Sequence, residues 1–362
     1  MPEAFRLWTA ITILGAVVEQ NVWVNMTSRK LYPNLYTFLV GSPGAGKTVT
    51  INAGAQFFRD LKEFKQGSTS VTGASLIREM TLAVKFLPDQ TPYNSLFLYP
   101  DDLQALMSDY KTDLIAALTV FYNTTPFSLS RKTENEQVRI ASPQLSLLAG
   151  TTPSQLMTLL PDGAWKEGFM SRTIVVQADH SPRRKDMFVG IEQGPKDALL
   201  HDINCIYLRR GPIDFTDSVR NEINEWRNSG CLPVPIHPKL EHYNTRRVGH
   251  ILKLCTISCI DRGADIIDGE DFSRAKSWLF EAETRIPRVF AGALSTDTEV
   301  MKELAHEVRA LTKVTEQKLN RMILDRGVKS TEAFRFKEML KETGYVCPVE
   351  IDGRTYYMAG KD

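Results

Sequence analysis

Residues 34–48 read NLYTFLVGSPGAGKT, and they contain the strongest structural signal of the chain. The first part, Asn34–Val40, is a short apolar run rich in residues that favour β-strands. A glycine-rich turn follows immediately, and Lys47–Leu61 then has the pattern of a helix. This order predicts a strand, a loop and a helix in direct succession.

The loop fits the pattern GxxxxGK[ST] at every position. Its glycines allow backbone N–H groups to curl around phosphate oxygens, and the helix adds its positive N-terminal end. Lys47 is expected to reach the β- and γ-phosphates, and the Thr48 hydroxyl to ligate Mg²⁺. We therefore expect ATP and Mg²⁺ as cofactors, bound by Gly41, Ser42, Pro43, Gly44, Ala45, Gly46, Lys47 and Thr48.

Further apolar runs follow along the chain, with helical stretches such as Gly73–Val84 and Leu103–Leu118 between them. Almost wholly apolar runs are typical of strands that are buried on both faces of a parallel sheet. The alternation predicts an α/β domain with a mostly parallel sheet over residues 1–194. The runs in question are Ser95–Tyr99, Gln144–Ala149 and Thr173–Gln177.

The pattern changes after about residue 194. Residues 195–294 lack strand signals of comparable strength, so we expect a separate, mainly helical domain there. The expected helices are Ala198–Trp226, Asn244–Ile260 and Asp271–Glu283.

A third pattern covers residues 295–362, where short helices precede two strand-like runs. Asp352-Gly353 lies between those two runs and is a strong hairpin signal. Three helices and a β-hairpin predict a winged-helix domain at the end of the chain.

The composition is that of an ordinary globular protein, with 43% hydrophobic and 24% charged residues. A formal net charge of +1 gives no overall field toward nucleic acid or membrane, so DNA contacts would need a local basic patch. The five cysteines lack the spacing of a zinc site or a disulfide framework. The most apolar segment, Leu7–Val18, is too short to span a bilayer and lacks a cleavage site. We therefore expect it to be a buried helix, and the protein to be cytoplasmic.

Two carboxylates follow the apolar run LFLYP, at Asp101 and Asp102. An ATPase with such a loop needs an acid on a neighbouring strand to hold Mg²⁺ and to polarise water. Asp101 is expected to hold the Mg²⁺ shell, and Asp102 to be the base that activates the attacking water. The alternative is a solvated turn that contains two acids by chance.

The ends of later strands offer further catalytic candidates. Thr152, just before Pro153, is our first choice for a polar side chain that senses the γ-phosphate, and Thr151 is the second; a cap of the next helix is the alternative. Arg172 directly precedes the last strand-like run and is a candidate for a finger that reaches the nucleotide of a neighbouring subunit. A surface salt bridge is the alternative for this arginine.

The expected helix Asn244–Ile260 has two different faces. Arg246, His250 and Lys253 form a polar stripe with the spacing i, i+4 and i+7, opposite an apolar side. Arg246, or its neighbour Arg247, is a candidate for contacting the nucleotide. A solvated helix face is an equally good interpretation.

Two places are candidates for nucleic-acid contacts. Residues 127–141 have the pattern of a β-hairpin with Arg131 and Lys132 near its tip, where basic side chains could grip phosphates. Neighbouring glutamates make a purely structural hairpin an equal alternative. In the expected winged helix, Arg335 and Lys337 lie on the helix that would enter a DNA groove.

The order of these motifs resembles that of AAA+ ATPases with a helical lid. The Thr-Pro strand end, the Ser171-Arg172 pair and the hairpin are similar to those of minichromosome-maintenance and superfamily 3 helicases. From Phe5-Arg6-Leu7-Trp8 through Leu31–Tyr36 to Gly150–Pro153, the text also resembles a poorly characterised family of phage- and plasmid-encoded ATPases often found beside primase modules. This likeness covers most of about the first 290 residues.

The resemblance implies a homo-oligomer, a hexameric ring, that works on single-stranded and duplex DNA during phage or mobile-element replication in a bacterial host. A primase or polymerase is the further partner that it suggests. Asp102 departs from the family pattern, which normally has Glu at this position. The first functional hypothesis is therefore an ATP-dependent DNA helicase or translocase. The rivals are an ATP-switched DNA-binding regulator or helicase loader, and a packaging or defence ATPase that unwinds nothing.

Overall fold

The structure, a computed structural model, divides the chain into two compact units, Met1–Val289 and Phe290–Asp362. The boundary that we expected at residue 194 lies inside the first unit, and the boundary expected at 294 lies close to the division. The residues described are 1–27, 29–61, 65–68, 70–107, 112–131, 136–160, 164–165, 168–178, 193–235, 238–293, 295–325, 328, 330–351 and 353–360.

A sheet with the strand order β4-β5-β8-β3-β9 forms the centre of the first unit. The strands are β3 (Tyr36–Val40), β4 (Val84–Phe86), β5 (Pro92–Leu98), β8 (Pro143–Thr151) and β9 (Thr173–Gln177). All run parallel except β4, which is antiparallel to β5. Val40 pairs with both Thr151 and Gln177, so the carboxyl ends of β3, β8 and β9 meet at one edge. The α/β class with a mostly parallel sheet is therefore confirmed.

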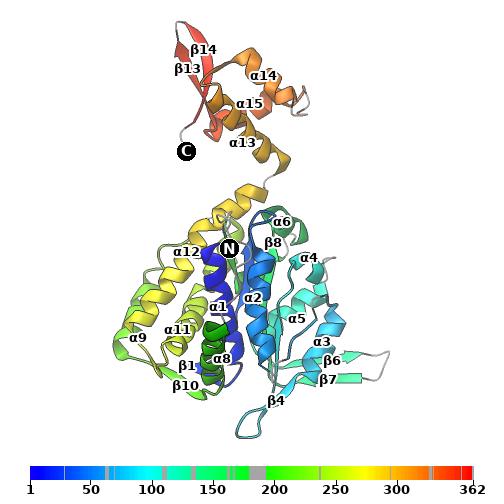
Figure 1. The fold of residues 1–362 in the computed structure, drawn as a ribbon, viewed down its shortest axis with the longest axis vertical. Helices are drawn as coiled ribbons and strands as arrows, with labels where there is room; N and C mark the ends of the chain where they lie inside the picture. Colours follow the sequence, from blue (N-terminus) through cyan, green and yellow to red (C-terminus); the bar gives the residue numbers. More distant parts are fainter. Residues whose placement is uncertain are drawn as a thin grey trace. The chain divides into compact units, whose positions relative to one another are not determined.

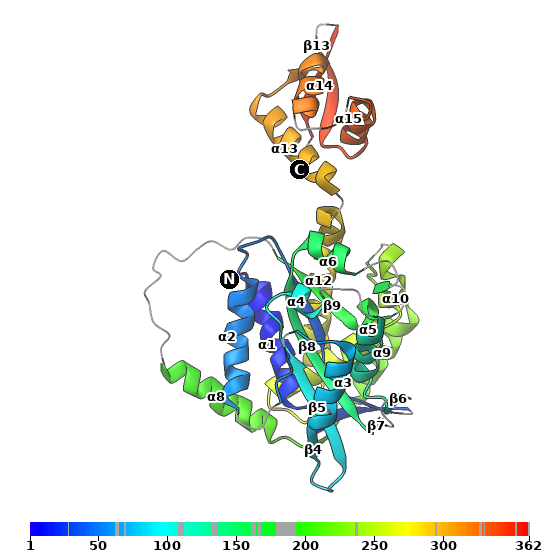
Figure 2. The same cartoon turned by 90° about the vertical axis from the view of Figure 1, so that its right-hand side faces the viewer.

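Helices cover both faces of this sheet (Figures 1 and 2). Helices α1 (Glu3–Val17) and α2 (Lys47–Asp60) pack on one face, where both contact β8. Helices α3 (Gly73–Leu82) and α5 (Thr112–Tyr122) pack on the other. Because the sheet is covered twice, every residue of β3 and of β8 is buried, which explains their nearly continuous apolar sequences.

A second sheet, of order β11-β10-β1-β2, joins the beginning of the chain to residues 195–289. Its strands are β1 (Val22–Met26), β2 (Arg29–Leu31), β10 (Gly211–Phe215) and β11 (Ile266–Ile267). β10 corrects our expectation of a mainly helical Ala198–Trp226, which is instead α8 (Gln193–Tyr207), β10 and α9 (Asp217–Asn228). Pro212 lacks an N–H and follows Gly211, so a helix could not run through this point.

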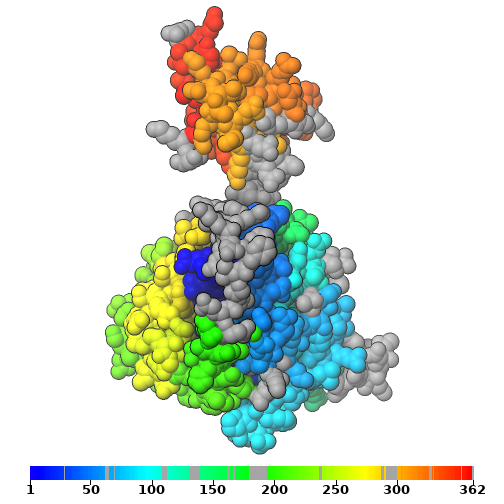
Figure 3. Space-filling view, viewed as in Figure 1, coloured from blue at the N-terminus to red at the C-terminus, as the bar shows by residue number. Residues whose placement is uncertain are grey.

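The remaining elements of the first unit are short helices, a hairpin and two long helices. They are α4 (Leu103–Leu106), β6 (Phe127–Arg131), β7 (Glu136–Ile140), α6 (Pro153–Leu159), η1 (Met170–Arg172), η2 (Pro238–Leu240), α10 (Glu241–Asn244), α11 (Arg247–Asp261) and α12 (Gly269–Ala293). On the face drawn in Figure 3, α8 (green) lies between the exposed parts of α12 (yellow) and α2 (blue).

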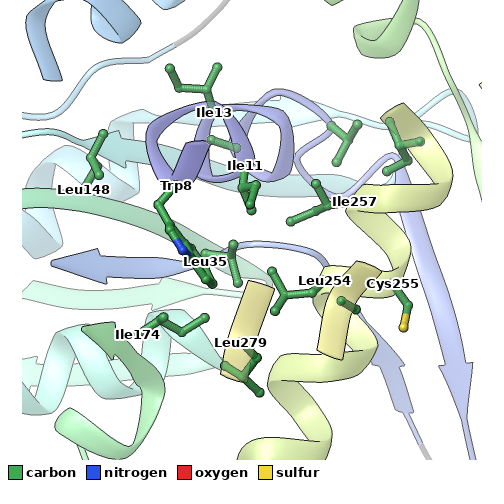
Figure 4. Close-up of a cluster of buried hydrophobic side chains, with 14 of the residues drawn as sticks. Trp8, Ile11, Ile13, Leu35, Leu148, Ile174, Leu254, Cys255, Ile257 and Leu279 are labelled. Atoms are coloured by element: carbon green, nitrogen blue, oxygen red, sulfur yellow. The ribbon is translucent and has the colours of Figure 1, made fainter. Parts of the chain in front are cut away.

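Helix α1 lies at the centre of the main core, between the sheet and α11 (Figure 4). Trp8 and Ile11 of α1 are each 2% exposed, and they share one cluster with Leu35, Ile174 and Ile257. The expectation that the apolar segment Leu7–Val18 forms a buried helix is confirmed. Among the described residues, no helix is long and apolar enough to cross a membrane.

The second unit contains α13 (Ser295–Ala310), β12 (Val314–Thr315), α14 (Glu316–Asp325), α15 (Ala333–Glu342), β13 (Val346–Ile351) and β14 (Arg354–Ala359). Its antiparallel sheet has the order β12-β14-β13. The core includes Leu304, Ile323 and Leu340, each 0% exposed. Phe334 of α15 lies outside this core, since its side chain is 70% exposed.

Candidate functional site

Residues Gly41–Thr48 connect β3 to α2 at the carboxyl edge of the central sheet. Gly44 (φ 79°) and Gly46 (φ 93°) adopt left-handed backbone conformations, which glycine reaches without the strain that a side chain would cause. Lys47 is the first residue of α2, and its Nζ donates to the carbonyl oxygens of Gly41 (2.7 Å) and Ser42 (3.0 Å). The ammonium group therefore lies inside the curve of the loop.

The acid pair lies at the same edge, directly after β5. Asp102 Oδ1 accepts the N–H of Gln104 at 2.9 Å and so caps α4, while Asp101 Oδ2 accepts the side-chain amide of Asn52 at 3.4 Å. Burial lowers the pKa of Lys47, and the Asp102 carboxylate opposes this by raising it. The ammonium and a carboxylate of the acid pair are thus close enough to interact.

Gly150, near the end of β8, holds these parts together by having no side chain. A Cβ built there would lie 2.6 Å from the backbone oxygen of Asp101 and 3.3 Å from Cβ of Lys47. The turn that contains Asp101 and the start of α2 therefore both pack against β8 at Gly150. The local sequence does not indicate this role of Gly150, because the role arises from the packing of three distant segments.

Thr151, the last residue of β8, and Thr152 lie at this edge as well. Thr152 Oγ1 accepts the N–H of Gln155 at 3.3 Å, so Thr152 is the N-cap of α6, which is the alternative that we had left open. Thr151 is 1% exposed. The loop, the acid pair and the two threonines are thus brought to one edge of the sheet by β3, β5 and β8.

Arg172 and Arg246 lie at the opposite, amino edge of the sheet. Arg172 precedes β9, whose first residue pairs with Tyr36 at the start of β3, and Arg246 lines a cavity together with Asn34. A strand of five residues separates the two edges by roughly 15 Å. The structure therefore does not bring either arginine to the Gly41–Thr48 loop of its own chain.

Among the described residues, Arg172 does not form the surface salt bridge that was the alternative for it. Arg172 is 6% exposed, its Nη1 donates to the carbonyl oxygen of Gly168 at 2.6 Å, and burial lowers its pKa to about 10. Arg247, the other nucleotide candidate of α11, is held by Glu283 through two 2.7 Å hydrogen bonds. Arg247 is fully buried and is thus a structural residue.

The polar stripe on α11 is not solvated as one interpretation had it. His250 is 1% exposed, burial lowers its pKa to about 3, and its neutral ring donates from Nε2 to the carbonyl oxygen of Ser171 at 3.0 Å. Lys253 is 3% exposed and donates to Asn34. The stripe therefore indicates a polar environment in the protein interior. Asn34 belongs to the same environment, although its local sequence did not indicate this.

The nucleic-acid candidates are only partly described. Arg131 ends β6, but its side chain, like the whole of Lys132, lies outside the described residues. Arg335 is exposed on α15. Lys337 is 7% exposed and its Nζ pairs with Glu316, so its charge is used within the second unit.

Comparison with known proteins finds no relative of this chain: no protein-family model and no curated protein matches it.

Proposed function

We propose that this chain is a P-loop ATPase of the AAA+ type, which binds ATP and Mg²⁺ at Gly41–Thr48 and acts as an oligomeric DNA helicase or translocase in phage or mobile-element replication. The observation that carries the proposal is the convergence of the glycine-rich loop, Lys47 and the acid pair at one edge of a parallel sheet. In open α/β sheets, ligands bind outside the carboxyl ends of the strands.

The residues at this edge fit a nucleotide and its metal. Mg²⁺ commonly takes one or two carboxylates, and phosphate oxygens complete its shell. Thr48, exposed in the first turn of α2, and Asp101 supply suitable oxygens. Among the described residues, no group of three or more His, Cys, Asp and Glu side chains could hold a metal.

Each side chain then has a distinct task. Lys47 neutralises the β- and γ-phosphates, and the backbone N–H groups near Gly44 and Gly46 cradle them. Asp102 Oδ1 caps α4, so the other carboxylate oxygen of Asp102 accepts the proton of the attacking water. Thr152 is the γ-phosphate sensor in this proposal.

At the nucleotide of a Gly41–Thr48 loop, Arg172 can have a role only in trans. Because Arg172 and Arg246 lie at the amino edge, they can reach a nucleotide held in such a loop only when a second copy presents its loop there, as in a hexameric ring. Single-stranded DNA would then contact Arg131 and Lys132 of the β6–β7 hairpin. The second unit is proposed to be a winged helix that meets duplex DNA, a primase or a polymerase through α15.

The test is nucleotide binding and turnover in two variants. Lys47→Ala should lose tight ATP binding because it removes the charge that faces the phosphates. Asp102→Asn should bind ATP but lose hydrolysis, since an amide cannot accept the proton. Asp113→Asn, an exposed acid on α5, is the matched control. ATP affinity in folded Lys47→Ala that equals wild type would overturn the loop assignment, and normal turnover in Asp102→Asn would remove Asp102 as the base.

Two features of Asp102 favour a second candidate, an ATP-switched DNA-binding regulator or helicase loader. Asp102 is one methylene shorter than the Glu expected at this position, and one of its oxygens is already engaged in capping α4. Both features favour slow hydrolysis. Strand separation on a forked DNA substrate supports the helicase; ATP-dependent DNA binding with negligible turnover supports the regulator.

A further inference from the structure

A cavity of about 40 Å³ lies at the amino edge of the central sheet, on the opposite side from the Gly41–Thr48 loop. We call it the amino-edge cavity. It is formed by the segment that leads into β3, the end of α5 and the start of α11. Four cations line it, and the described lining includes neither Asp nor Glu. Those cations are Arg29, Lys30, Arg246 and Lys253.

Lys253 is the most buried of these cations, at 3% exposure. Its Nζ donates to the backbone oxygen (2.7 Å) and to Oδ1 (2.8 Å) of Asn34, and lies 3.8 Å from the ring centroid of Tyr122. Asn34 is itself fixed, because its amide donates to two backbone oxygens. Among the described residues, the ammonium group therefore contacts neutral groups, in a rigid frame.

The positive charge at this cavity is only partly compensated within the described part of the chain: the charge of Lys30 acts on the Asp89 carboxylate, whose pKa it helps to lower. No described carboxylate forms an ion pair with Arg29, Arg246 or Lys253. Burial, together with the charges of Arg29, Arg172 and Arg246, holds the pKa of Lys253 well below its ordinary value.

Two other buried cations of this chain, Arg247 and Lys337, each have an acid beside them. Arg247 is held by Glu283 through two hydrogen bonds, and Lys337 pairs with Glu316. Burying a cation is costly unless an anion lies beside it. An anionic ligand would remove this cost at the amino-edge cavity and would in turn be held by it.

The start of α11 adds to this attraction. Arg246 is its N-cap, and Gly249 in its first turn lines the cavity. The positive end of a helix of 15 residues therefore faces the same space. A Cβ added at Gly249 would meet no atom within 4 Å, so the backbone is uncovered there. Glycine inside a helix costs roughly 1 kcal/mol relative to alanine, which is consistent with a position kept open for a ligand.

We propose that the amino-edge cavity binds the phosphate group of a small molecule, as free phosphate or as a terminal phosphate monoester, through Arg29, Arg246 and Lys253. The cavity has room for more than one water and hence for one small oxyanion. A terminal phosphate offers three free oxygens to donors on several sides, whereas a nucleic-acid phosphodiester offers two. The length of β3 separates this site from the Gly41–Thr48 loop, so the inference holds whether or not that loop binds ATP.

Calorimetric titration of the full-length chain tests the proposal, at constant ionic strength in chloride. All variants also contain Lys47→Ala, so that a phosphate bound in the Gly41–Thr48 loop does not obscure the result. The probes are inorganic phosphate and, separately, AMP, a phosphate monoester. Equal affinities mean that the phosphate group alone is recognised, and tighter AMP binding means that the ligand is a larger monoester; both support the proposal.

Arg246→Gln should weaken phosphate binding about tenfold or more, since a charge-assisted hydrogen bond is lost. Lys253→Met should do the same if it folds. Gly249→Ala adds one methyl group on the open side of the first turn; it should weaken binding several-fold while the protein melts at the same or a higher temperature. Arg78→Gln changes an exposed arginine of α3 and should leave binding unchanged.

Two results would overturn the proposal. The first is that phosphate and AMP bind to Arg246→Gln and Gly249→Ala with the same affinity as to the parent. A parent that binds neither probe at millimolar concentration would count equally against the proposal. The other is a single-stranded oligonucleotide whose binding these two variants weaken while neither small probe binds. That outcome would make the cavity part of a nucleic-acid surface.

Discussion

At Gly150 the absence of a side chain decides how three segments meet. The backbone oxygen of Asp101 and the Cβ of Lys47 both lie within 3.3 Å of the place that a Cβ would occupy. Neither is the end of a flexible side chain, so neither can give way without moving a main chain. The spacing between the acid pair and the loop therefore depends on one residue that carries no functional group.

We accordingly expect Gly150→Ala to lower the stability of the first unit by about 1–3 kcal/mol, the usual cost of overpacking. It should also weaken ATP binding, because Asp101 and Lys47 are pushed apart. Thermal unfolding and nucleotide titration measure the two effects. Gly194→Ala is the control, since a Cβ there meets no atom within 4 Å and alanine favours helices. Wild-type melting of Gly150→Ala would show that the turn adjusts freely.

His250 links the amino edge of the sheet to pH. Its folded pKa is about 3 because of burial, against an ordinary value of 6.5. Between these values the unfolded chain binds a proton at this residue that the folded chain does not, so stability falls as the pH falls below 6.5. The contribution lost amounts to about 2 kcal/mol at pH 5, at 1.36 kcal/mol for each pKa unit.

We predict that His250→Gln flattens the loss of stability between pH 7 and pH 5, because glutamine can donate to Ser171 and does not titrate. Denaturant unfolding at several pH values measures this. His242→Gln, at an exposed position in α10, should keep the wild-type slope. Parallel curves for wild type and His250→Gln would mean that the ring is protonated, or becomes exposed, at a higher pH than its burial implies.

At the scale of elements, the sequence predicted well those strands that are buried on both faces. The run Thr173–Gln177 is β9 to the residue, and Ser95–Tyr99 and Gln144–Ala149 overlap β5 and β8. These strands are recognisable because nearly all of their side chains are apolar or small. β10 was missed, since only Ile213 of its five residues is buried. Its pairing with β1 joins residues almost two hundred positions apart, which no local pattern reports.

Helical spacing shows which residues share a face, but not what that face meets. The stripe of α11 turned out to be interior at His250 and Lys253, because Asn34 and Ser171 supply polar partners there. On α15, the exposures of Phe334 and Lys337 are the reverse of what their side-chain chemistry suggests. The Phe334 side chain is 70% exposed, whereas Lys337 is 7% exposed. Lys337 is buried because Glu316 on α14 pairs with it.

The two basic candidates on α15 should therefore behave differently. Lys337→Ala removes a packed side chain and should lower the melting temperature of the second unit by several degrees, since a domain of 60–100 residues shifts by about 4–8 °C per kcal/mol. Arg335→Ala, at an exposed position, should leave melting unchanged and weaken duplex DNA binding. Equal melting of both variants, with equal losses of DNA affinity, would show that Lys337 is free to bind phosphate.

At the scale of the whole molecule, the carboxyl-edge site was accessible to sequence analysis because each part of it is local. The loop follows β3, the acids follow β5 and the two threonines lie at the end of β8, and parallel strands bring such ends to one edge. No comparable rule predicts the amino-edge cavity from the sequence. Its lining comes from segments around residues 29–34, 122–124 and 246–253, and only their packing reveals that Arg29, Arg246 and Lys253 gather there.

The division into two units leads to the last prediction. The main core of the first unit contains residues from Phe5 to Ala282, and the core of the second contains residues from Met301 to Tyr357, with none in common. A chain that ends at Leu294 should therefore stay folded and bind ATP like the full-length protein. If the second unit is a winged helix, this deletion should reduce duplex DNA affinity at least several-fold and flatten its salt dependence, because phosphate contacts are lost. Full-length Arg335→Ala should show a smaller loss in the same direction.

Because acids nearly balance bases in the second unit, its own affinity for duplex DNA is expected to be weak and to be raised by avidity in an oligomer. Sedimentation of both chains separates the two roles: a shortened chain that binds duplex DNA normally but no longer assembles would make the second unit an oligomerisation module and would contradict its assignment to DNA.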